Sequence, residues 1–84
     1  MTELIFSFGA TVRSLREGRG WSQELLAEKA DLNRSFLGEV ERGKVIPSLA
    51  TAAKLAEALG FKLSSLLADC EGRADGVAVV AIAC

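Results

Sequence analysis

The sequence predicts an all-α domain of five helices, followed by a short apolar C-terminal arm with the character of a strand. Two observations predict this fold. Apolar residues recur at helical spacing in successive stretches up to about residue 67. Glycine, proline or a residue that caps helices well separates each stretch from the next. A chain of 84 residues makes one domain, which buries only about 60–65% of the surface that its unfolded form exposes, so we expect marginal stability for the isolated chain.

The first two helices are predicted at about residues 5–18 and 22–30. The first carries an apolar face at helical spacing, formed by Ile5, Phe8, Val12 and Leu15. The second begins at Ser22, which is a favourable N-cap. Trp21 precedes this cap and can pack on Leu26 as a hydrophobic staple, which favours a core position for Trp21 over a role as a stacking platform.

A third helix is predicted at residues 34–42, after a tight turn at residues 31–32. Asn33 is its expected N-cap, and Gly43 stops it. Its apolar residues fall on one side and its polar residues on the other, so we expect one face in the core and one face in solvent.

The fourth helix is predicted to begin after Ser48, its N-cap, and to end at Gly60. Its inward face is expected to consist of Leu49, Ala52, Leu55, Ala56 and Leu59. Residues 63–67 indicate a short fifth helix. Residues 71–76 are expected to form a loop, and the branched apolar run at residues 77–83 is typical of a strand.

Composition excludes several kinds of site. The chain has no histidine, and its two cysteines, Cys70 and Cys84, lack the CxxC spacing of a zinc site. We therefore expect no metal, no cofactor and no enzymatic activity. Neither the apolar residues 4–8 nor the apolar C-terminal run has the features of a signal peptide or a membrane span, so we expect a cytoplasmic protein with reduced thiols.

The predicted second and third helices, joined by residues 31–33, have the dimensions of a helix-turn-helix. Residues 13–60 resemble the Cro/lambda-repressor-type (XRE-like) helix-turn-helix family nearly throughout. The motifs that carry the resemblance are Arg16, Ser22–Gln23, Leu26–Ala27, Glu41–Arg42–Gly43, Pro47–Ser48 and Leu59–Gly60. The likeness covers residues 8–67, about 70% of the chain. It implies a five-helix, lambda-repressor-like DNA-binding domain at residues 1–69, followed by the arm at residues 70–84.

Within this resemblance the third helix is the one that enters the major groove of DNA. Arg34 lies at its N-terminal end, the part that meets base edges in this motif, and arginine can donate two hydrogen bonds to guanine. Ser35 can donate or accept. Glu39 can accept from cytosine, orient a neighbouring arginine, or simply face solvent. Gly38 is costly in a helix but lets the helix approach DNA closely. Asn33, the N-cap of this helix, is expected among the DNA-binding residues as well.

The resemblance also implies contacts that position the protein without reading sequence. Gln23 begins the second helix and matches a family residue that holds a phosphate. Arg42 and Lys44 follow the third helix and are expected to contact phosphates as well. Arg16 and Glu41 match a pair that forms an internal salt bridge between the first and third helices. One departure from the family pattern is Asp31, which stands where the turn commonly has glycine; aspartate tolerates the left-handed backbone conformation.

The net charge of −1 is distributed unevenly. Residues 1–62 hold nine basic and eight acidic residues, a balance of +1, whereas residues 63–84 hold one basic and three acidic residues, a balance of −2. The acidic excess therefore lies toward the C-terminus, away from the expected DNA surface.

The resemblance implies a sequence-specific transcriptional regulator that binds double-stranded DNA as a homodimer, with no small-molecule ligand. Its operator would be two-fold symmetric, with half-sites about 34 Å apart. A controller protein of a restriction–modification system and a phage-type repressor both fit. The alternative is an antitoxin that binds a toxin protein and its own promoter, and a third possibility is a protein-interaction module on the same scaffold.

The dimer interface is expected in the last part of the chain, where apolar residues outnumber what one small core needs. The expected contacts are Phe61, Leu63, Leu66, Leu67, Val77 and Val79. An exposed strand-like run would be an aggregation hazard on a monomer, so it must be covered. The alternative to a dimer is that the arm folds back over its own helices, beside residues 4–8.

Overall fold

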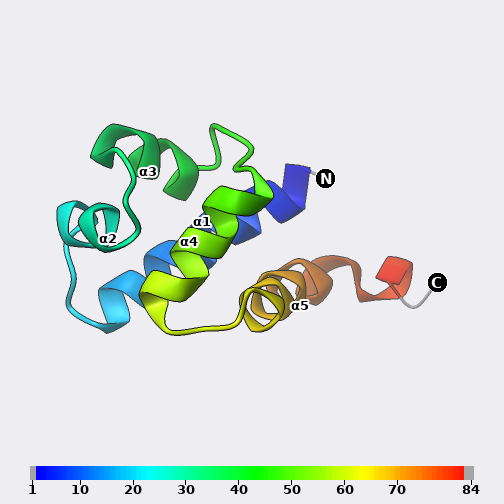
Figure 1. Ribbon diagram of the computed structural model, residues 1–84. Helices are drawn as coiled ribbons and strands as arrows, with labels where there is room; N and C mark the ends of the chain where they lie inside the picture. Colours follow the sequence, from blue (N-terminus) through cyan, green and yellow to red (C-terminus); the bar gives the residue numbers. More distant parts are fainter. Residues whose placement is uncertain (1, 83–84) are drawn as a thin grey trace.

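The structure is a computed structural model that describes the backbone of residues 2–82 and the side chains of residues 3–72. The described part of the chain forms five α-helices: α1 (Thr2–Gly18), α2 (Gln23–Lys29), α3 (Arg34–Glu41), α4 (Leu49–Leu59) and α5 (Leu63–Ile82). Helix α1 packs against α3, α4 and α5, and α2 packs against α3 and α4. Helices α2 and α3 lie together at one end of the molecule and α5 at the other (Figure 1). The predicted all-α fold is confirmed.

Helices α2, α3 and α4 begin at the caps that the sequence predicts. The side-chain oxygens of Ser22, Asn33 and Ser48 each accept a hydrogen bond from a backbone N–H two or three residues later, at 2.8–3.2 Å. Helix α4 ends at Gly60, which has a φ of +85°. Asp31 adopts the left-handed conformation expected of it, with a φ of +56°, and so turns the chain between α2 and α3.

All five helices contribute to one core. Its buried apolar residues are Phe8, Val12, Leu26, Ala27, Ala30, Leu37, Val40, Ala52, Leu55, Ala56, Leu59, Leu66 and Cys70. The prediction that Leu49 faces inward is wrong, because its side chain is 74% exposed. Leu49 is the first residue of α4, and it lines an open hollow that no described part of the chain fills. The inward face of α4 begins one turn later, at Ala52.

Helices α1 and α3 approach each other closely at Gly9. A Cβ atom at this position would collide with the carbonyl oxygen of Val40 and lie 2.8 Å from that of Glu41. Because both contacts involve backbone atoms, which side-chain rotation cannot move, the approach requires glycine. Gly9 therefore sets the distance between α1 and the outward-facing helix α3.

The predicted loop at residues 71–76 and the predicted strand at residues 77–82 are wrong, because α5 continues as a helix to Ile82, and residue 83 lies outside the described residues. Leu66 and Cys70 lie one turn apart on α5 and are both fully buried, so core packing carries the helix past residue 69 without a break. Alanines are frequent beyond that point, and alanine favours helix more than any other residue. None of the helices described here combines the length and apolarity needed to cross a membrane.

Thr11 is a fully buried residue of α1 whose hydroxyl makes no hydrogen bond within the described part of the chain. We expect Thr11→Val to raise the free energy of unfolding by about 1–2 kcal/mol, since valine keeps the shape and removes the unpaired polar group. Thermal unfolding measures this change. Thr51→Val is the control, because the Thr51 hydroxyl accepts a hydrogen bond from Ser48 at 3.1 Å and its loss should not stabilise the fold. A lower melting temperature for Thr11→Val would contradict the assignment.

Candidate nucleic-acid interface

The outer face of α3 carries the polar residues that the sequence assigned to it. Leu37 and Val40 are buried against the core. On the opposite side Arg34, Ser35, Glu39 and Arg42 are all exposed. Lys44 is exposed just beyond the helix. Asn33 has its side-chain oxygen engaged in capping α3, which leaves its amide N–H groups as the part available to another molecule.

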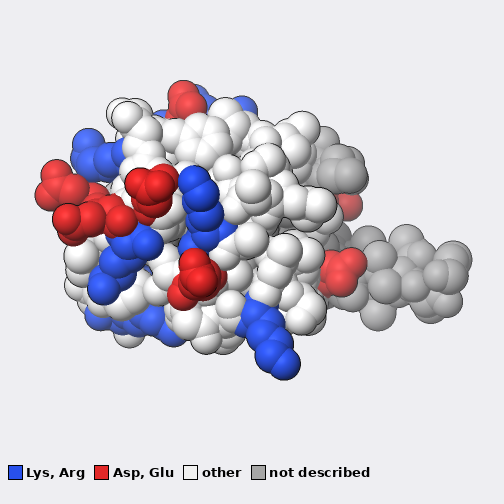
Figure 2. All heavy atoms as spheres, viewed as in Figure 1, with Lys and Arg blue, Asp and Glu red and all other residues white. Residues whose placement is uncertain are grey.

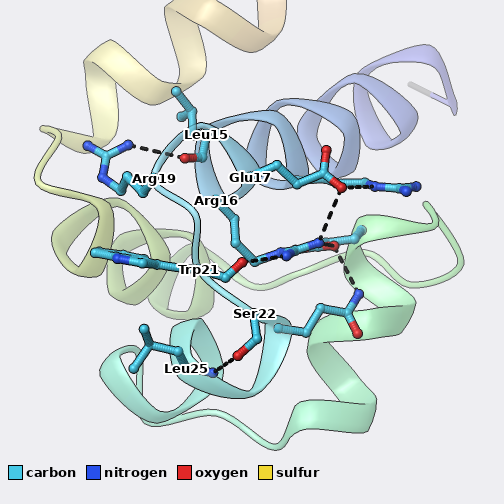
Figure 3. A network of polar contacts seen from close by, with 10 residues as sticks. Leu15, Arg16, Glu17, Arg19, Trp21, Ser22 and Leu25 are labelled. Carbon is cyan, nitrogen blue, oxygen red and sulfur yellow. Dashed lines mark hydrogen bonds and ion pairs between the residues drawn. The ribbon is translucent and has the colours of Figure 1, made fainter.

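An ion pair between Arg16 and Glu41 joins α1 to α3. Arg16 Nε donates to Glu41 Oε2 at 2.8 Å, and a terminal nitrogen of Arg16 donates to Glu41 Oε1 at 3.1 Å. Both side chains are buried, to 10% and 2% exposure. The other terminal nitrogen donates to the carbonyl oxygen of Trp21 at 2.7 Å (Figure 3). The hydrogen bonds that Arg16 donates to the Glu41 carboxylate raise the pKa of Arg16, so the guanidinium stays charged in any buffer used for DNA binding.

Gln23 ties the second helix to the same carboxylate. Its amide nitrogen Nε2 donates to Glu41 Oε1 at 2.9 Å. Glu41 on α3 is therefore hydrogen-bonded to Arg16 on α1 and to Gln23 on α2. Three helices meet at one buried side chain, which fixes how far α3 stands out from the body of the protein.

A polar hollow lies on the outer face of α3 and reaches the start of α2. Its lining residues are Gln23, Arg34, Ser35, Gly38, Glu39 and Arg42. Gly38 lines this hollow and is itself buried. A Cβ atom there would lie 3.2 Å from a terminal nitrogen of Arg42 and 3.6 Å from Gln23 Oε1. The missing side chain thus makes room for two neighbouring polar groups of the protein itself, a role that the sequence did not suggest.

Arg19 has a structural role that sequence reasoning missed. One terminal nitrogen donates to the carbonyl oxygen of Leu59 at the end of α4, and the other donates to Leu15 at 3.3 Å. Its guanidinium lies 5.6 Å from the ring centre of Trp21 and 5.4 Å from that of Phe61. Arg19 is exposed, and these contacts link the residue that follows α1 to the end of α4. The one feature of the sequence that could have indicated this role is the position of Arg19, two residues before Trp21.

Charges of both signs occupy the end of the molecule formed by α2 and α3. Figure 2 shows Lys and Arg side chains interspersed with Asp and Glu over this end. Arg13, an exposed residue, pairs with Glu17 at 3.1 Å. This face is not uniformly positive. What it offers to a nucleic acid is therefore hydrogen-bond donors at specific positions on α3.

The residues expected at a dimer interface are dispersed. The prediction that Leu66 lies at the dimer interface is wrong, because its side chain is fully buried in the core of its own chain. Phe61, Leu63 and Leu67 are half-buried at the edge of that core. The side chains of Val77 and Val79 lie outside the described residues.

An apolar hollow lies where α1, α4 and α5 come together with the segment before α4. Its lining residues are Leu4, Ile5, Phe8, Ile46, Pro47, Ser48, Leu49, Ala52 and Leu67. Ile46 and Leu49 at its rim are 72% and 74% exposed. Figure 2 shows an uncharged surface over the beginning of α4 and the neighbouring part of α1. A charge-free surface with protruding aliphatic side chains is suited to burial against another protein.

Comparison with known proteins gives relatives for most of this chain. A family model of the helix-turn-helix matches residues 12–66. The immunity repressor protein of Bacillus phage phi105 is 39% identical over 61 residues, which are 73% of this chain and 42% of the repressor. Control protein C.MunI from a Mycoplasma species is 36% identical over 72 residues, which are 84% of this chain and 97% of that protein. The chain thus spans less than half of the repressor and nearly all of the control protein.

A solved structure extends the likeness to the backbone. The restriction–modification controller protein C.AhdI from Aeromonas hydrophila superposes with a TM-score of 0.72 at 42% sequence identity. The match covers 79% of this chain and 98% of that structure. The similarity in sequence and the similarity in fold therefore point to the same group of proteins.

Proposed function

Because the chain belongs to the helix-turn-helix (XRE-type) family of DNA-binding transcription regulators, we propose that it acts as a homodimer that reads a two-fold symmetric operator. The observation that carries this proposal is the outer face of α3, where Arg34 and Ser35 stand exposed at the helix start. The buried pair Arg16–Glu41 holds that helix in a fixed position. A rigidly held helix with donors at its N-terminal end suits insertion into the major groove.

Each exposed residue of this face has a proposed role on DNA. Arg34 donates to guanine, and Ser35 and Glu39 lie beside it for further contacts with base edges. Arg42 and Lys44 at the end of α3, Gln23 at the start of α2 and the free amide of Asn33 are placed to contact the phosphate backbone. We expect no enzymatic activity, in keeping with a family whose members regulate transcription, and we expect the protein to act in the cytoplasm.

A homodimer is supported by the apolar hollow. One copy of this small domain leaves Ile46 and Leu49 in solvent, and a second copy related by a two-fold axis would bury them. Such a dimer has two copies of α3, and each copy would enter one half-site of the operator. The two half-sites would lie about 34 Å apart. Leu67 lines the hollow and keeps its place in the proposed interface.

Among the candidate roles, a restriction–modification controller has the most support. The match covers 97% of control protein C.MunI and 98% of the C.AhdI structure, but 42% of the phage repressor. A phage-type repressor remains the second form of the same function. The antitoxin alternative gains no support from these relatives.

Selection of bound sequences from random duplex DNA tests the proposed function. We expect enrichment of one sequence with two-fold symmetry and a fixed half-site spacing. Failure to enrich any sequence over the starting pool, with folded protein, would refute a sequence-specific regulator.

Replacing Arg34 by alanine should weaken binding to the selected operator by about 1–3 kcal/mol, a rise in Kd of about 5- to 150-fold. Binding to random DNA should change little, since a base contact contributes only at the correct sequence. Titration of both DNAs at fixed salt measures the difference. Arg13→Ala is the control, because it also removes one exposed arginine but from α1. Equal losses on both DNAs would assign Arg34 to a phosphate.

A further inference from the structure

The side chain of Arg42 folds back along α3 and lies over Gly38. Arg42 is the C-cap of the helix and stands one turn after Gly38, whose carbonyl oxygen accepts its backbone N–H at 3.1 Å. Side chains on a helix lean toward its N-terminus, so a long side chain covers the residue one turn earlier. A terminal nitrogen of Arg42 accordingly lies 3.2 Å from the point where a Cβ of Gly38 would be. A side chain at position 38 would therefore displace this guanidinium.

Gln23 of α2 borders the same point. Its amide oxygen lies 3.6 Å from the Cβ position at Gly38, so it faces the Arg42 guanidinium, a cation that the amide dipole attracts. Its amide nitrogen carries two hydrogens. Glu41 accepts one of them at 2.9 Å and leaves the other available to a ligand. Groups from two helices thus meet over Gly38, and both line the polar hollow.

The guanidinium over Gly38 is available to a ligand. Arg42 is exposed and forms no ion pair in the part of the chain whose side chains are described. Its N–H groups are donors only, as is the remaining N–H of Gln23, and a DNA phosphate offers only acceptors. Base edges are met by the N-terminal end of such a helix, whereas Arg42 stands at its C-terminal end. A backbone phosphate is therefore the ligand that fits these two residues.

We propose that Gly38 is a positioning residue for DNA binding: because it lacks a side chain, Arg42 can reach along α3 toward Gln23, and the two residues bind one backbone phosphate together. The proposal rests on the proposed function, since it assigns two phosphate contacts of that DNA-binding face to a single phosphate. It also explains a glycine inside α3, at a position where alanine would favour the helix.

Methylphosphonates locate the phosphate, because each replaces one charged phosphate oxygen by a methyl group. The probes are copies of the operator selected with the unchanged protein, each with one such replacement in a half-site. At one position we expect the Kd of the unchanged protein to rise about 10- to 150-fold, the contribution of hydrogen bonds between charged groups. Gln23→Ala and Arg42→Gln should both respond less at that same position and normally at the others. Arg42→Gln should also lower the slope of log Kd against log salt by about 0.9.

Gly38→Ala is the decisive variant, because it removes no donor and no charge. Its methyl group displaces the guanidinium, so we expect the response at the shared phosphate to fall about 2- to 10-fold, with base-pair discrimination unchanged. Its melting temperature should be at or above that of the unchanged protein, since alanine favours the helix. Gly18→Ala is the matched control. Gly18 ends α1, and a Cβ there would have no neighbour within 4 Å, so no phosphate response should change.

Three results would overturn the proposal. If Gln23→Ala and Arg42→Gln lost their responses at different phosphates, the two residues would not share one. A full response of Gly38→Ala at the shared phosphate would show that Gly38 does not position Arg42. Loss of discrimination at one base pair in Arg42→Gln would assign Arg42 to a base edge. All three results presuppose an operator selected by the unchanged protein, so they are distinct from failure of the proposed function, in which no operator is enriched.

Discussion

Replacing Arg16 by alanine is expected to lower the free energy of unfolding by about 3–5 kcal/mol, because it leaves the Glu41 carboxylate buried at 2% exposure without its cationic partner. A loss of this size is a large fraction of the stability of a domain of 84 residues. The melting temperature should fall by roughly 4–8 °C per kcal/mol. Chemical denaturation and thermal unfolding both measure the change.

Arg13→Ala is the matched control for this experiment. Arg13 lies on the same helix and also pairs with a glutamate, but the two side chains are 61% and 54% exposed. An exposed pair contributes about 0–1 kcal/mol, so we expect little change. If Arg16→Ala melted at the unchanged temperature and yet failed to bind DNA, Arg16 would belong to the DNA contact and not to the frame that holds α3.

Local chemistry explains why so much of the fold could be predicted from the sequence. The caps at Ser22, Asn33 and Ser48 act on backbone groups two or three residues away, and such short-range preferences are visible in a single sequence. The left-handed turn at Asp31 is of the same kind. The ion pair between Arg16 and Glu41, which are 25 positions apart, came instead from the family resemblance.

The features that sequence reasoning missed depend on contacts between distant segments. Arg19 donates a hydrogen bond to the carbonyl oxygen of Leu59, 40 residues away, and no local sequence pattern predicts that bond. Leu49 fits the apolar spacing of α4, but spacing cannot tell whether another element covers the helix end. Helix α5 is longer than the sequence predicts because Cys70 is buried, so packing against the core continues past residue 69.

The Gln23 amide illustrates a further limit. Its position at the start of α2 was predicted, and so was its place at the DNA surface. Which of its two ends faces outward depends on Glu41, a residue 18 positions later on another helix. Chemical identity alone therefore could not give the orientation of the amide, which the hydrogen bond to a buried carboxylate determines.

The second large effect is expected at the apolar hollow. In the proposed dimer a two-fold axis places each rim residue in the interface twice, once from each copy. Burial of a side chain such as leucine or isoleucine contributes about 1.5–3 kcal/mol, so one replacement removes about twice that amount from the dimer. Ile46 and Leu49 are exposed in the single copy, so replacing them should leave the fold of that copy intact.

We therefore expect the double variant Ile46→Asp, Leu49→Asp to raise the dimer dissociation constant by at least about 100-fold, since two buried carboxylates add repulsion to the loss of apolar burial. Sedimentation over a dilution series measures this constant, and operator titration at low protein concentration should show a matching loss. Lys54→Asp is the control, because it places a carboxylate on an exposed part of α4 that does not line the hollow. Dimers of unchanged stability in the double variant would exclude this hollow as the interface and direct attention to the far end of α5.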